Sequence, residues 1–396
     1  MTDPNIETKL SHRQTAEPKV DQITKFERDY EPPNFTFKEL REAIPSHCFE
    51  RDTLRSASYM VKDLSIVAIL VYAATLIDVY LPQTLRFFAW LVYWFFCGAF
   101  ATGLWVIAHE CGHQAFSSSK LINDTVGFIL HSALLVPYHS WRITHAKHHN
   151  YTAHVDKDQV FVPKTRKALG LPPKNDQNDQ NDHDDGTSIL EDTPIFSLMM
   201  LIFQQLFGWP LYLIFNTSGQ VYKNRWVNHF NPSSPIFDPK HYNDIIISDI
   251  GLIISFSIIG YFSYIYSFMT VVKYYLIPYL IVNHWLVLIT YLQHTDPKLP
   301  HYREKQWSFV RGAACTVDRH FGFLDSIFHR ISSTHVAHHY FSKMPHYHAE
   351  EATIHIKKVL GSYYIFDDTP IFKALWRSYV QCRFIEDEGD VIFYKK

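Results

Sequence analysis

Three short histidine clusters carry the clearest potential for chemistry in this 396-residue sequence. They read His109-Glu-Cys-Gly-His113, His145-Ala-Lys-His148-His149 and His335-Val-Ala-His338-His339. Each cluster contains histidines three or four residues apart, a spacing that places side chains on one face of a helix. Eight imidazoles are more than the four ligands of a structural zinc site. The count therefore predicts two metal ions, with the eight nitrogens divided into two sites of four.

The ligand type alone does not name the metal, because imidazole suits iron, zinc and copper. The location is more informative, since all three clusters lie beside apolar segments. A redox-active metal pair in such a place would activate dioxygen and remove hydrogen from an unactivated C–H bond of a lipid chain. A hydrolase has no need of two redox metals beside hydrocarbon. The clusters therefore favour oxidative chemistry.

Two alternatives of other classes remain open. The first cluster also matches the H-E-x-x-H pattern of zinc metalloproteases, with Glu110 as general base. A zinc membrane protease would leave the six histidines of the other clusters unexplained. A metal-binding transporter would need ionisable residues inside its spans, whereas the long apolar runs here are uncharged apart from Asp78.

The elements that must position the clusters are membrane helices. Four segments have the length and composition of transmembrane spans, and Pro82 and Lys273 divide them into two hairpins. We predict spans at residues 64–82, 87–108, 250–272 and 274–294. A polar cytosolic region (1–60) precedes the membrane domain (61–386), and a short tail (387–396) follows it. Residues 174–186, rich in Asn, Asp and Gln, are predicted to be a solvated, disordered insert.

Topology follows from the requirement that the clusters share metals. Two further apolar segments, Leu121–Tyr138 and Ile195–Phe215, are interrupted by polar residues and prolines, and we predict that both lie in the interface. If either crossed the bilayer, the clusters would face opposite compartments. The lysines and arginines near the clusters indicate a cytosolic side. The predicted fold is an all-α polytopic membrane protein with four transmembrane helices and a cytosolic helical cap that holds a di-metal site.

Composition excludes other classes of function. The formal net charge is −2, so the basic stripe of a nucleic-acid-binding protein is not expected. The five cysteines form no CxxC pair and are expected to be reduced thiols. No glycine-rich nucleotide fingerprint is found among the 14 glycines.

Longer stretches around the clusters resemble the membrane fatty acyl desaturases, most closely the microsomal oleate Δ12 (omega-6) desaturases of plants and fungi. The resemblance extends from about Asn34 to Glu386. It rests on IAHECGHQAFS, PYHSWRITHAKHHNYTAH, DKDQVFVPKTR, LITYLQHTDP, THVAHHYFSKMPHYHAEEAT and FDDTP. In the first box, Glu110 and Gln114 resemble Δ12 members more than ω3 members.

The resemblance implies nine iron ligands, with His294, at the end of the last span, added to the eight box residues. The implied ligands are His109, His113, His145, His148, His149, His294, His335, His338 and His339. Two positions depart from relatives: Thr290 stands where some have a water-bridging asparagine, and Ser333 stands where many plant members have aspartate. The remaining histidines near the boxes are predicted to pack or to orient others. They are His131, His139, His154, His284, His320, His329, His346 and His348.

The resemblance also implies the activity. We expect oxygen-dependent desaturation of a membrane-lipid fatty acyl chain, oleoyl to linoleoyl, by a diiron centre with O2 as co-substrate. An omega-3 (Δ15) desaturase or an oleate 12-hydroxylase would use the same ligands. No His-Pro-Gly-Gly haem motif is present, so the implied electron donors are a separate cytochrome b5 and its NADH reductase. The implied location is the endoplasmic reticulum membrane, and the positive-inside bias described above places both termini in the cytosol.

Overall fold

The computed structural model describes residues 30–173 and 193–396, and the predicted insert at 174–186 lies outside these residues. The described chain is mainly helical. Its first half contains α3 (Phe37–Ala43), η1 (Ser46–Phe49), α4 (Thr53–Tyr80), α5 (Gln83–Gly112), α6 (Lys120–Ala133), α7 (Tyr138–Tyr151), η2 (Lys167–Leu169) and α8 (Pro194–Phe215). Then follow η3 (Pro239–His241), α9 (Tyr242–Tyr266), α10 (Phe268–Val271), the π-helical turn η4 (Val272–Leu276), α11 (Ile277–His294), α12 (Phe309–Ala313), α13 (Leu324–Ile327), α14 (His335–Tyr340), α15 (His346–Leu360), η5 (Gly361–Tyr363) and α16 (Ile371–Gln381).

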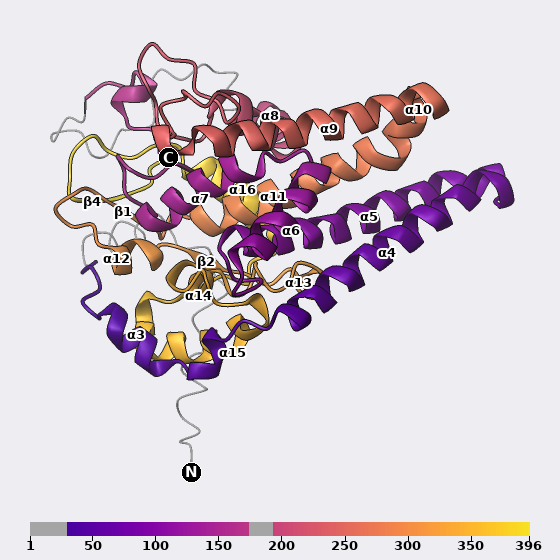
Figure 1. The fold of residues 1–396 in the computed structure, drawn as a ribbon. Helices are drawn as coiled ribbons and strands as arrows, with labels where there is room; N and C mark the ends of the chain where they lie inside the picture. Colours follow the sequence, from indigo (N-terminus) through magenta and orange to yellow (C-terminus); the bar gives the residue numbers. More distant parts are fainter. Residues whose placement is uncertain (1–29, 174–192) are drawn as a thin grey trace.

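Helices cover all four predicted spans. The α4–α5 hairpin and the α9–α11 hairpin project together from a broader cap, and their turns lie at the far tips (Figure 1). Helices α4 and α9 expose large apolar side chains such as Ile69, Tyr72 and Ile253. So extensive an exposed apolar surface is typical of contact with lipid. Helix α5 lies inside the bundle and packs against both α4 and α11.

The break in the second hairpin is not where the sequence predicted it. The lone charge of Lys273 suggested a boundary there, but the chain turns at Ser267, which has a φ of 100°. The Ser267 hydroxyl accepts a hydrogen bond from the Thr270 N–H and begins α10. Lys273 instead lies inside a continuous helical segment, with its Nζ 3.2 Å from Asp78 Oδ2 in the other hairpin. A charge paired across the hairpins does not have to end a helix.

The two ambiguous apolar segments differ from each other. The first is α6, which is followed by a bend of 108° into α7. The second is α8, a helix of 22 residues that contains Pro210 and is long and apolar enough to cross a membrane. Length and composition therefore leave more candidate spans than the four predicted.

The cap is held by a core between the segment before α4 and the segment after α14. Leu40, Ile44 and Cys48 are buried there against Ala352 and Ile356 of α15. The prediction of a purely α-helical cap was wrong, because four short strands pair within the described part of the cap. Strand β1 (Pro300–Tyr302) pairs antiparallel with β4 (Val391–Phe393), and β2 (Val317–Asp318) pairs parallel with β3 (Ile365–Phe366).

Candidate metal centre

The three histidine clusters meet where four helices end or begin. Helix α5 brings His109 in its last turn and ends at Gly112, directly before His113, and α7 carries the second cluster. Helix α11 ends at His294, and α14 begins at His335. The nine predicted ligands thus come from four helices that are far apart in the sequence, and the fold brings all nine together.

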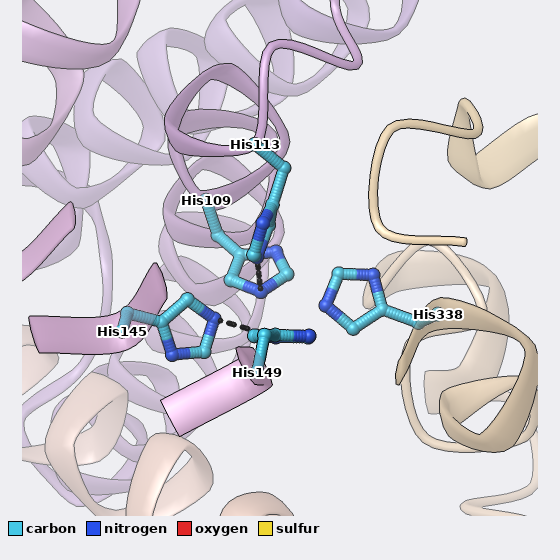
Figure 2. Close-up of side chains that lie close together, drawn as sticks. All are labelled: His109, His113, His145, His149 and His338. Atoms are coloured by element: carbon cyan, nitrogen blue, oxygen red, sulfur yellow. Dashed lines mark hydrogen bonds between the residues drawn. The ribbon is translucent and has the colours of Figure 1, made fainter. Parts of the chain in front are cut away.

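Five of the nine form one group, called here the five-histidine group. Its members are His109, His113, His145, His149 and His338. One ring nitrogen of each lies within 4.8 Å of those of the others. Figure 2 shows the rings from α5 and α7 facing His338 across a common space. The Nε2 atoms are 3.2 Å apart in His109 and His113 and 3.1 Å apart in His145 and His149.

The other four form the four-histidine group: His148, His294, His335 and His339. The His294 Nε2 atom is 3.4 Å from His148 Nε2 and 3.0 Å from His335 Nε2. The His335 and His339 Nε2 atoms are also 3.0 Å apart. The groups adjoin each other, since His149 and His339 stack with ring centroids 4.1 Å apart. The eight box histidines thus divide five and three, not four and four as expected, and His294 completes the second group.

The geometry fits metal coordination. A metal–nitrogen bond of about 2.1 Å would hold neighbouring nitrogens about 3.0 to 3.4 Å apart, which is the range seen here. Burial, and then neighbouring imidazoles, lowers the pKa of His113 to about 3 and the pKa values of His335 and His339 well below their usual range. Neutral imidazole is the metal-binding form. The His338 Nε2 atom is buried and has no hydrogen-bond partner among the described residues.

Two side chains that the sequence analysis did not single out orient the four-histidine group. Asp158 Oδ1 lies 2.7 Å from His148 Nδ1, and the Asp158 carboxylate is itself held by the N–H groups of Ala153 and Val160. Thr152 donates its hydroxyl hydrogen to the His148 carbonyl, so its oxygen accepts from His339 Nδ1 at 3.1 Å. Both contacts leave Nε2 facing the group. Such partners fix the ring orientation and raise ligand basicity.

Two carboxylates support the cap side of the centre. Glu110 Oε2 accepts a hydrogen bond of 3.0 Å from the His346 N–H, and Glu110 Oε1 lies 3.7 Å from His109 Nδ1 and 3.9 Å from His338 Nδ1. Asp318 accepts hydrogen bonds from the Val336 N–H and the Tyr364 hydroxyl, and so fixes the start of α14. Within the described residues, Ser333, the departure from plant relatives, hydrogen-bonds back to the Arg330 carbonyl alone. Asp318, which lies on strand β2, thus anchors the helix that carries the third box.

A large cavity of about 1600 Å³ reaches the centre. Its wall includes His109, His145, His148, His294 and His335, and most of the remaining inner wall is apolar. Helices α5, α8, α11 and α16 line it. Thr290 also lines it, but its hydroxyl donates back to the Leu286 carbonyl at 2.8 Å.

The eight other histidines lie outside both groups. Several have ordinary partners: His154 contacts Glu304, His320 contacts Asp325, and His329 contacts Asp63, at 2.7 to 3.0 Å. His348 differs, because it belongs to a separate group with His47, Cys48 and Glu351.

Comparison with known proteins gives a consistent result. Residues 88–369 match the family model described as fatty acid desaturase, and residues 4–73 match one described as a domain of unknown function. A Delta(12) fatty acid desaturase of Mortierella isabellina is 58% identical over 94% of this chain and 93% of its own length. A Delta(12)-acyl-lipid-desaturase of Punica granatum is 46% identical over 92% and 91%. An endoplasmic reticulum omega-6 fatty acid desaturase of Brassica juncea is 44% identical over 90% and 89%.

Proposed function

This chain belongs to the fatty acid desaturase family, an oxidoreductase family, and we propose that it converts oleoyl chains of membrane phospholipids to linoleoyl chains. The observation that carries the proposal is the cavity, whose mostly apolar wall contains five of the nine grouped histidines. The named Δ12 relatives support the position of the new double bond. Lys164 and Arg383 line the same cavity and are suited to an anionic lipid phosphate.

The proposed reaction removes one hydrogen from each of two adjacent carbons. Those two hydrogens, two electrons and two protons reduce one O2 to two waters. Two iron ions held by the nine histidines would supply the oxygen-activating chemistry when bound. In the proposed roles, the neutral imidazoles bind the metals, and Asp158 and Thr152 keep two of them turned inward. The apolar residues Trp105, Val106 and Leu286 hold the acyl chain and exclude water.

We also propose the four-span topology. The three clusters meet at one site and therefore lie on the same side of the membrane. The chain must then cross the membrane an even number of times between one cluster and the next. Helices α9 and α11 form an antiparallel pair between the second and third boxes. If α8 also crossed, His148 and His294 would end on opposite sides, yet their Nε2 atoms are 3.4 Å apart. The contact supports an α8 that does not cross alone. The basic residues near the boxes support a cytosolic centre.

The electron source and the compartment complete the proposal. Separate cytochrome b5 and its NADH reductase would supply the two electrons, as the family resemblance implies. The endoplasmic reticulum membrane is supported by the name of the Brassica juncea relative.

The test is a fatty acid profile of a yeast that makes no polyunsaturated chains and expresses this protein. We expect linoleate with the new double bond at Δ12, none with His338→Ala, and an unchanged amount with His320→Ala, a matched histidine outside both groups. A Δ15 double bond or a 12-hydroxy chain would replace the proposed specificity. The absence of any new lipid, with intact protein in the membrane and cytochrome b5 present, would refute the proposal.

A further inference from the structure

A second group of metal-ligating side chains lies in the cap, separate from the nine histidines. We propose that His47, Cys48, His348 and Glu351 form a structural zinc site, which goes beyond the proposed desaturase function. The four ligand atoms lie within 4.8 Å of one another. His47 and Cys48 come from η1, before the first membrane helix, and His348 and Glu351 come from α15, after the third box.

The spacing of the atoms is close to that of a tetrahedral zinc ion. Zinc bonds of about 2.0 to 2.3 Å imply ligand separations of about 3.3 to 3.7 Å. His47 Nε2 lies 3.0 Å from Glu351 Oε2 and 3.7 Å from Cys48 Sγ. The remaining separations would have to shorten by about an ångström at most.

Packing holds the two ligand pairs opposite each other. His348 and Glu351 are three residues apart on α15 and therefore share a face. Cys48 is fully buried in the cap core against the same helix. His47 faces His348 with ring centroids 5.6 Å apart. The neighbouring Arg55 does not take the place of a metal, because its guanidinium lies over the Tyr347 ring.

The ligand chemistry favours zinc over a surface ion pair. Zinc accepts thiolate, imidazole and carboxylate in closed four-ligand sites. One thiolate and one carboxylate would neutralise a divalent ion. The exposed His47–Glu351 pair contributes little stability, and it does not account for the presence of His348 beside it. Without a metal, burial and then the Glu351 charge raise the pKa of the Cys48 thiol to about 11. A bound zinc ion would instead hold the thiolate.

The site would fasten the segment before α4 to the helix that follows the third box. Zinc there would stabilise the cap without touching substrate. Its expected signature is one zinc per chain in the purified protein, beyond any iron, and a thermal midpoint that falls when zinc is removed.

The experiment uses the full chain in detergent, stripped of metal and titrated with Co²⁺. We expect a thiolate-to-cobalt charge-transfer band whose final intensity corresponds to one thiolate-bound cobalt per chain, whatever amount of cobalt the nine histidines also bind; a site of histidines alone cannot give this band. Cys48→Ser should abolish the band, and Cys382→Ser, a matched free cysteine, should retain it. Glu351 is half-exposed, so Glu351→Gln should leave the fold intact. We expect this variant to bind cobalt at least about tenfold more weakly, because a loss of that size follows even from removing a side chain that only hydrogen-bonds to a ligand.

The proposal is overturned if folded wild-type protein shows no thiolate band, or if the band survives Cys48→Ser. It is also overturned if Glu351→Gln binds cobalt as tightly as the wild type. None of these results depends on lipid products, so failure here and failure of the desaturase proposal can be told apart.

Discussion

The two histidine groups contain the same kind of ligand but are supported differently. In the four-histidine group, His148 and His339 have hydrogen bonds at Nδ1, to Asp158 and Thr152. In the five-histidine group, the Nδ1 atoms of His109 and His149 have no hydrogen-bond partner within the described residues, and in the four-histidine group the same is true of His335 Nδ1. Ring stacking holds this group instead, with Trp105 against His109. One group thus has more ligands and the other has two ligands that are oriented by hydrogen bonds at Nδ1, so the two metal positions should not be equivalent.

The largest expected effect comes from removing a ligand from each group in turn. His335→Ala leaves three histidines in its group, whereas His338→Ala leaves four. We expect both variants to lose desaturation completely. Iron should fall to about one per chain in His335→Ala and stay closer to two in His338→Ala, because four imidazoles still complete a site. Iron analysis of the purified variants measures the difference, and equal iron losses would contradict the five-and-four division.

A smaller effect is expected from the carboxylate behind His148. Asp158→Asn removes the charge that raises the basicity of that imidazole, and iron affinity should fall by about 10- to 100-fold. Desaturation should recover partly when iron is added in excess. Glu304→Gln, which changes the carboxylate beside His154, serves as the control and should bind iron normally. Normal iron affinity in Asp158→Asn would show that the contact is not coupled to the metal.

The smallest effect is expected at Thr152. Thr152→Val keeps the shape of the side chain and removes the oxygen that accepts from His339 Nδ1. The loss of one hydrogen bond of about 1 kcal/mol corresponds to about a fivefold loss of iron affinity. Thr290→Val is the matched control, since that hydroxyl bonds within its own helix. If the two variants bound iron equally well, Thr152 would have no orienting role.

The sequence was most informative about features that depend on the composition or spacing of a single segment. Uncharged runs marked the membrane helices, because lipid excludes unpaired charge. The same rule failed at Lys273, whose partner Asp78 is 195 residues away and invisible to local composition. The boxes were found because histidines three or four residues apart share a helix face.

What the sequence did not reveal depends on contacts between elements. His148 and His149 are neighbours in the chain but belong to different groups, because successive residues on a helix point in different directions. Asp158 lies in a loop after α7, where no periodicity marks its role. Glu110 resembles a protease base in its motif, yet its contact with the His346 N–H requires α15 to be in place. The strands of the cap are only two or three residues long, too short for an alternating pattern.

The most direct test of the central claim is the iron content of the purified full-length protein, combined with the Mössbauer spectrum of ⁵⁷Fe-enriched material. The five- and four-histidine groups predict two irons per chain and two iron signals of equal area with different parameters. One iron per chain, or zinc in place of iron at the nine histidines, would contradict the account.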